Sequence, residues 1–191
     1  GNFTDHQTSL INYVITQWRN DEDKISMVKV FCKYGVDVNE YSLNYTTGIK
    51  LFGCNYSCFS EIIDQFGYEM TPLATVLTTN RIRFKEIDVD TKKALVNILL
   101  DYGANVESPI YCTRRGGNYT YDRYCPIHLA LVNRDFEIFN LLLQYGADAN
   151  TPFPEDNWEY SEFTPLQFLV TICDFNSDVR DLIVKMIEDF E

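Results

Sequence analysis

Three separated stretches of the chain end in nearly the same phrase. Each is an apolar run with helical spacing that stops at Tyr-Gly and continues with a small residue and an Asn or Asp. These stretches span residues 30–39, 98–107 and 141–150. Glycine ends a helix at low cost, because it adopts a positive φ without a side-chain clash. The repetition predicts several similar helical units, each closed in the same way.

A second phrase opens helices elsewhere in the chain. Thr-Pro-Leu begins at Thr71 and at Thr164, and Cys125-Pro-Ile-His is close to it. A threonine can cap the first backbone amides of a helix, and proline at the first helical position has no amide to satisfy. An opening phrase that alternates with a closing phrase predicts pairs of short antiparallel helices that stack and share one core.

Together the two phrases resemble the ankyrin repeat, in which Thr-Pro-Leu-His-x-Ala is followed by Leu-Leu-x-x-Gly-Ala-Asp-x-Asn. The resemblance covers four units, over residues 8–39, 71–107, 125–150 and 164–191, and is strongest in the second and third. It implies an all-α ankyrin-repeat solenoid that forms one domain. It also implies that His128 braces its loop by hydrogen bonding. The fourth unit lacks the closing phrase, so we expect the chain to be the N-terminal part of a longer protein.

The units are farther apart than this resemblance requires. The openings at residues 8, 71, 125 and 164 are 63, 54 and 39 residues apart, whereas ankyrin repeats recur about every 33 residues. Part of the excess lies within the first two units, and the rest predicts enlarged inter-repeat hairpin loops. Long loops cost little closure entropy, so sequence drift under weak constraint is one interpretation. The other is that the loops form the binding surface.

We call the three enlarged connections fingers one, two and three, over residues 40–70, 108–124 and 151–163. In finger two, Gly116-Gly117 lies between two β-prone runs and predicts a two-residue hairpin turn. The arginines and tyrosines around it could bind RNA, could bind a carboxylate-rich protein surface, or could fold back on finger three, which is the alternative we favour. The residues of finger two predicted to make contacts are Arg114, Arg115, Tyr119 and Tyr121.

Finger three combines acidic and aromatic side chains. It holds four acids and four aromatics within 13 residues, and exposed aromatics beside charges are typical of interface hot spots. The alternative is that two or three of the aromatics pack on the helices beneath, while the acids only keep the loop soluble. The residues of finger three predicted to bind a protein are Phe153, Glu155, Asp156, Trp158, Glu159, Tyr160 and Glu162.

Acidic residues are concentrated towards the end of the chain. The net charge is −12; residues 1–134 carry 15 acidic and 14 basic side chains, whereas residues 135–191 carry 13 acidic and two basic ones. Such a surface repels nucleic acid and anionic membranes, because neutralising phosphate requires Lys and Arg. It favours a protein partner with a basic patch.

The sequence does not support catalysis, a metal or a cofactor. It contains no glycine-rich phosphate loop and no Gly-x-Ser-x-Gly motif. Cys54 and Cys58 lie four residues apart, but a zinc site needs two more ligands, and neither His6 nor His128 is placed to supply one. No apolar run is long enough to span a membrane, and we expect a cytoplasmic protein. Three further cysteines fall in apolar helical phrases and are expected in the core: Cys32, Cys125 and Cys173.

The irregular units, rich in Asn, Asp, Ile and Tyr, resemble in style the ankyrin proteins of poxviruses. That resemblance implies a non-enzymatic adaptor whose repeats capture a host innate-immunity or inflammatory-signalling protein. In that family a C-terminal F-box-like segment, which this sequence does not contain, delivers the captured protein to a ubiquitin ligase; direct blocking is a variant. Two alternatives stay open. One is an IκB-like mimic that masks the basic surface of a transcription factor, and the other is a cellular or bacterial ankyrin scaffold.

Overall fold

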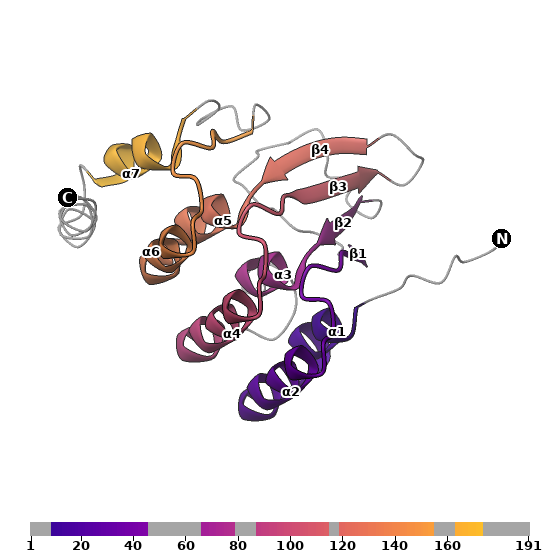
Figure 1. The fold of residues 1–191 in the computed structure, drawn as a ribbon. Helices are drawn as coiled ribbons and strands as arrows, with labels where there is room; N and C mark the ends of the chain where they lie inside the picture. The colour runs from indigo at the N-terminus through magenta and orange to yellow at the C-terminus, as the bar shows by residue number, and fades with distance from the viewer. Residues whose placement is uncertain (1–8, 46–65, 79–86, 115–118, 155–162, 174–191) are drawn as a thin grey trace.

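The structure, a computed structural model, describes residues 9–45, 66–78, 87–114, 119–154 and 163–173. Within these ranges the chain is mainly helical, and a sheet extends from one side of the helices (Figure 1). The helices are α1 (Leu10–Gln17), α2 (Asp21–Lys33), α3 (Pro72–Thr78), α4 (Val89–Asp101), α5 (Pro126–Asn133), α6 (Phe136–Gln144) and α7 (Pro165–Cys173). The sequence-based expectation of a mainly helical fold is therefore confirmed for this part of the chain.

The helices pack as pairs: α1 against α2, α3 against α4, and α5 against α6. Neighbouring pairs contact each other through α1, α3 and α5, and α7 continues this inner row by packing on α5. The outer helices α2, α4 and α6 lie side by side on the far side of the inner row from the sheet (Figure 1). The fold thus has an outer helical layer, an inner helical layer and a projecting sheet.

The helix ends follow the two sequence phrases. Gly35, Gly103 and Gly146 have φ values of 78°, 85° and 88°, so each closing glycine occupies the left-handed region, as predicted. At the opening of α7, the Gln167 amide donates to Thr164 Oγ1 at 3.2 Å. In the first unit, Ser9 caps α1, because its Oγ accepts the Asn12 amide at 3.2 Å.

One continuous core runs through all the helix pairs. Every side chain of α3 is buried, and the first six residues of α5, Pro126 to Leu131, are buried as well. Cys32 and Cys125 are 5% and 7% exposed and carry free thiols, which confirms their prediction as core residues. The side chain of Cys173 lies outside the described part, so its prediction stays untested. The inner helices α3 and α5 are therefore enclosed by their neighbours, whereas α1 and α7, at the two ends of the inner row, keep exposed residues such as Tyr13 and Val170.

Fingers one and two form one sheet, which the sequence analysis did not predict. The strands are β1 (Ser42–Tyr45), β2 (Phe66–Met70), β3 (Ile110–Arg114) and β4 (Tyr119–Tyr124), all antiparallel and in the order β1-β2-β3-β4. The β3–β4 pair confirms a hairpin in finger two, although the expected turn at Gly116-Gly117 lies outside the described residues. The unpredicted contact is β2 with β3, where Gly67 pairs with Thr113 and Glu69 with Tyr111. The edge of a two-stranded pair leaves backbone N–H and C=O groups unpaired. Pairing of β2 with β3 satisfies these groups and joins the two strand pairs into one sheet.

The same polar contact links each closing loop to the next. The Asn105 amide donates to Asn39 Oδ1 at 2.7 Å, and the Asn39 side chain donates back to the Gly103 carbonyl at 3.0 Å. At the corresponding place in the next loop, the Asp148 amide donates to Glu107 Oε1 at 2.8 Å. The last side chain of each of these two closing stretches therefore bonds the loop of the next helix pair and helps to position it.

A buried ion pair joins the N-terminal ends of α4 and α6. Lys92 of α4 places its ammonium 2.8 Å from Asp135, and the two side chains are 2% and 19% exposed. Close by, Lys93 pairs with Glu137, but there the side chains are 48% and 74% exposed. The stem of Lys92 lies in the core, and its charge is neutralised by the residue that precedes α6.

Replacing Asp135 with Asn should lower the free energy of unfolding by about 2 kcal/mol, because it leaves the Lys92 ammonium buried beside a neutral amide. The loss is smaller than for a fully enclosed pair because Asp135 is partly solvated. Replacing Glu137 with Gln breaks the exposed pair and should cost about 0.5 kcal/mol or less. Urea unfolding at pH 7 compares the two variants. Equal losses would contradict a buried role for Lys92.

Candidate functional site

Finger three is closed at its base by two phenylalanines. The Phe153 amide donates to the Phe163 carbonyl at 2.8 Å, so the chain leaves and returns at one place. The Phe153 side chain is 2% exposed, and its ring lies 4.4 Å from the ring of His128 and 5.0 Å from that of Phe168, between centroids. Tyr124, at the end of β4, also meets the Phe153 ring edge-on at 6.4 Å. Aromatic packing therefore connects the base of finger three to finger two and to two inner helices.

The imidazole of His128 is the polar element of this base. Its Nδ1 accepts the Cys125 amide at 3.1 Å, so the ring proton is on Nε2, which donates to the Thr151 carbonyl at 2.8 Å. His128 is fully buried, and this burial lowers the pKa of the imidazole to about 4. The ring is therefore neutral at physiological pH and connects the start of α5 to the start of finger three. This is the bracing role that the resemblance implied.

The prediction that Phe153 belongs to a binding surface is wrong. Its ring is enclosed by His128, Phe168 and Tyr124, and burying a phenylalanine stabilises a fold more than leaving it exposed. Phe163 is also partly buried against the core. Two of the four aromatics of finger three thus point inward, as the alternative interpretation allowed. They anchor the loop and are not available for contact.

The other predicted residues of finger three lie in the segment between these two anchors, outside the described part of the chain. That group is Glu155, Asp156, Trp158, Glu159, Tyr160 and Glu162. In finger two, Arg115 also lies outside it, whereas the backbones of Arg114, Tyr119 and Tyr121 belong to strands β3 and β4. The Arg114 backbone pairs with Phe66 of finger one and Tyr119 pairs with Thr113. The described strands of finger two thus pair with finger one, while Tyr124 at the end of β4 packs on Phe153 of finger three. The expected contact of the arginines and tyrosines with the acids of finger three lies outside the described residues.

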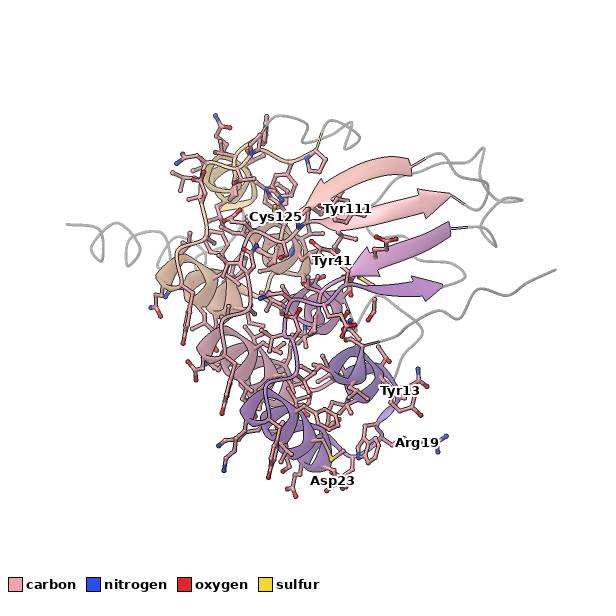
Figure 2. All side chains as sticks on the ribbon, turned by 45° about the vertical axis from the view of Figure 1, so that its right-hand side comes forward. Tyr13, Arg19, Asp23, Tyr41, Tyr111 and Cys125 are labelled. Atoms are coloured by element: carbon pink, nitrogen blue, oxygen red, sulfur yellow. The ribbon has the colours of Figure 1, made fainter. Side chains whose placement is uncertain are left out.

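Tyr41 connects the bases of fingers one and two and was not among the predicted residues. Its hydroxyl donates to the Pro109 carbonyl at 3.1 Å, and its ring lies 5.4 Å from the ring of Tyr111 (Figure 2). Partial burial of the hydroxyl raises the pKa of Tyr41 to about 12. Tyr41 lies two residues after a closing stretch and gave no signal of its own, because its partners are about 70 residues away in the sequence.

Among the residues that the structure describes, no three His, Cys, Asp or Glu side chains gather where they could hold a metal ion. Over the same ranges, no helix combines the length and the apolar character needed to cross a membrane. The distinctive features are the buried base of finger three and the sheet of fingers one and two.

Comparison with known proteins finds one matching family model, over part of the chain. An ankyrin repeat is found at residues 122–151, which run from the end of β4 through α5 and α6 to Thr151. This is the segment in which His128 braces the base of finger three. No curated protein matches the chain. Ankyrin repeats are typically non-enzymatic interaction modules, and the comparison indicates no enzyme family.

The low pKa of His128 predicts a loss of stability in mild acid. The unfolded imidazole titrates near pH 6.5 and the folded one near 4, so the unfolded chain binds more protons between these values. The free energy of unfolding should therefore fall as the pH drops below about 7, by about 2 kcal/mol at pH 5, and the loss should be complete below about pH 4. Urea unfolding at pH 7.5 and at pH 5 measures this difference in the free energy of unfolding.

The matched control is His128→Gln, whose amide can still donate a hydrogen bond but does not titrate. The variant should be less stable at pH 7.5, and its stability should change little between the two pH values. An unaltered pH dependence in the variant would show that another group causes the loss.

Proposed function

We propose that the chain is a protein-interaction module built as an ankyrin-type solenoid, and that finger three binds a partner carrying a basic patch. The observation that carries the proposal is the ankyrin repeat at residues 122–151, followed directly by the buried aromatic base at which both ends of finger three meet. Between those ends the sequence places four acids and two aromatics within eight residues, 155–162. A fixed base supports binding, because less conformational entropy is lost when the loop meets its partner.

This segment holds two kinds of side chain, one of which contributes to affinity and the other to the association rate. Trp158 and Tyr160 offer the large aromatic surface that supplies most of the affinity in protein interfaces. The four carboxylates offer charge that attracts a basic surface from a distance and raises the association rate. The 13 acidic residues among residues 135–191, against two basic ones, support a partner of opposite charge.

The finer identity of the partner rests on the resemblance of the sequence in style to poxvirus ankyrin proteins. On that basis we propose a host innate-immunity or inflammatory-signalling protein, which is either blocked or passed to a ubiquitin ligase through a further C-terminal segment. An IκB-like mimic that masks the basic surface of a transcription factor is the alternative. Binding to a basic nuclear-localisation peptide would favour the mimic, and recovery of ubiquitin-ligase subunits with the full-length protein would favour the adaptor.

Replacing Trp158 with Ala should weaken partner binding about 30-fold, as truncating a hot-spot aromatic costs about 2 kcal/mol. Its melting temperature should not change, because the proposal places Trp158 on the surface. Phe153→Ala is the control from the base of the same finger, and should cost about 3 kcal/mol of stability through the cavity it leaves. A partner captured with the wild-type chain would be titrated against each variant by biolayer interferometry. A sharp drop in the melting temperature of Trp158→Ala would place this residue in the core.

Neutralising the acids of finger three should act mainly on the association rate. Asp156→Asn with Glu159→Gln and Glu162→Gln should slow association several-fold and reduce its salt dependence, with a smaller change in dissociation. Surface plasmon resonance at low and physiological ionic strength separates the two rates. If association is insensitive to salt in the wild-type chain, electrostatic steering by finger three is excluded. Finger one, around residues 41–66, then becomes the next candidate surface.

A further inference from the structure

The three outer helices each end in an exposed tyrosine at the same repeat position. Tyr34, Tyr102 and Tyr145 follow α2, α4 and α6, directly before the closing glycine, and their side chains are 82%, 44% and 41% exposed. Helix closure needs the glycine but not the tyrosine, because only the glycine adopts a positive φ. Helix closure therefore does not account for the three large aromatics on the surface.

Contacts between the helix pairs place these tyrosines in one row. The Tyr145 hydroxyl donates to the Asp101 carboxylate, which directly precedes Tyr102. In the same way, Asn39 donates to the carbonyl of Gly103, which follows Tyr102, and so ties the Tyr34 loop to the Tyr102 loop. The ion pair of Lys92 with Asp135 joins the opposite ends of α4 and α6. These two helices therefore run parallel, with their C-terminal ends at one edge of the outer layer.

The surroundings of the row are negatively charged. Asp37, Asp101 and Asp148 are all exposed, one beside each tyrosine loop. The carboxylates of Asp37 and Asp148 each accept the backbone amide two residues further on, at 2.8 Å, so both side chains are held in place. The helix C-termini add partial negative charge. Lys33 of α2 is the basic residue in the last turns of these three helices.

We propose that this tyrosine row binds an extended, cationic segment of a partner protein. Arginine or lysine side chains would lie over the tyrosine rings by cation–π contact, and the aspartates would pair with the same charges. Packed helices are about 8–10 Å apart, and an extended chain rises about 3.3 Å per residue. A basic residue at every third position therefore matches the row. The proposal concerns the outer helical layer and does not depend on finger three.

The test uses a fluorescein-labelled 12-residue peptide with arginine at every third position and glycine or serine between. Fluorescence anisotropy at about 150 mM salt should show that the wild-type chain binds it about tenfold more tightly than a triple variant, Tyr34→Ser with Tyr102→Ser and Tyr145→Ser. The triple variant keeps every charge, so general attraction to an acidic protein is unchanged.

The chain offers a matched control. Tyr13 is 52% exposed on α1, on another face of the molecule (Figure 2), and Tyr13→Ser should change affinity by less than about twofold. A peptide of the same composition with its arginines adjacent should bind several-fold more weakly to the wild-type chain. Trp158→Ala should leave binding of this peptide unchanged, which separates the row from finger three. If the triple variant does not fold, Tyr34→Ser alone, at the most exposed position, should weaken binding about twofold to threefold.

Three results would overturn the proposal. The triple variant could bind as tightly as the wild type, Tyr13→Ser could cause the same loss, or the peptide with adjacent arginines could bind equally well. Each would mean that the peptide is held by the net negative charge of the protein and not by the tyrosine row.

Discussion

Polar groups at the boundaries between helix pairs determine how the rest of the molecule is arranged. His128 is the clearest case, because its two ring nitrogens satisfy a backbone amide at the start of α5 and a backbone carbonyl at Thr151. Asn39 and Glu107 act in the same way between successive closing loops. Hydrophobic burial holds the helices together but does not specify direction. These hydrogen bonds specify the relative orientation of the helix pairs, and they fix where each finger begins.

Different parts of the chain therefore contribute to stability and to binding. The buried residues of α3 and α5 contribute stability and offer no surface. A partner can reach the fingers, the outer helical layer and the exposed residues of α1 and α7. Fingers one and two pair in a four-stranded sheet, and finger three is anchored at its base by buried aromatic side chains. Acidic finger three and the tyrosine row both suit a partner with positive charge, which agrees with the net charge of −12.

Local features were predictable from the sequence and long-range pairings were not. The closing glycines, the cap at Thr164 and the core cysteines Cys32 and Cys125 follow from nearest-neighbour chemistry. The inward turn of Phe153 does not, since it depends on rings from α5 and α7 that meet only in three dimensions. The pairing of β2 with β3 joins residues more than 40 apart, and no local pattern selects that partner for a β-prone strand. The repeated tyrosine was visible in the sequence, but its exposure was not.

Native-state hydrogen exchange tests the central claim most directly, because it reports on the amides that bridge the helix pairs. The amides of Asn105, Asp148 and Phe153 lie outside helices and strands, and each donates across a boundary or across the base of finger three. If these contacts position the fingers, all three amides should exchange orders of magnitude more slowly than an unstructured chain. Exchange at the unprotected rate, with the helices still protected, would show that the fingers are not fixed by this frame.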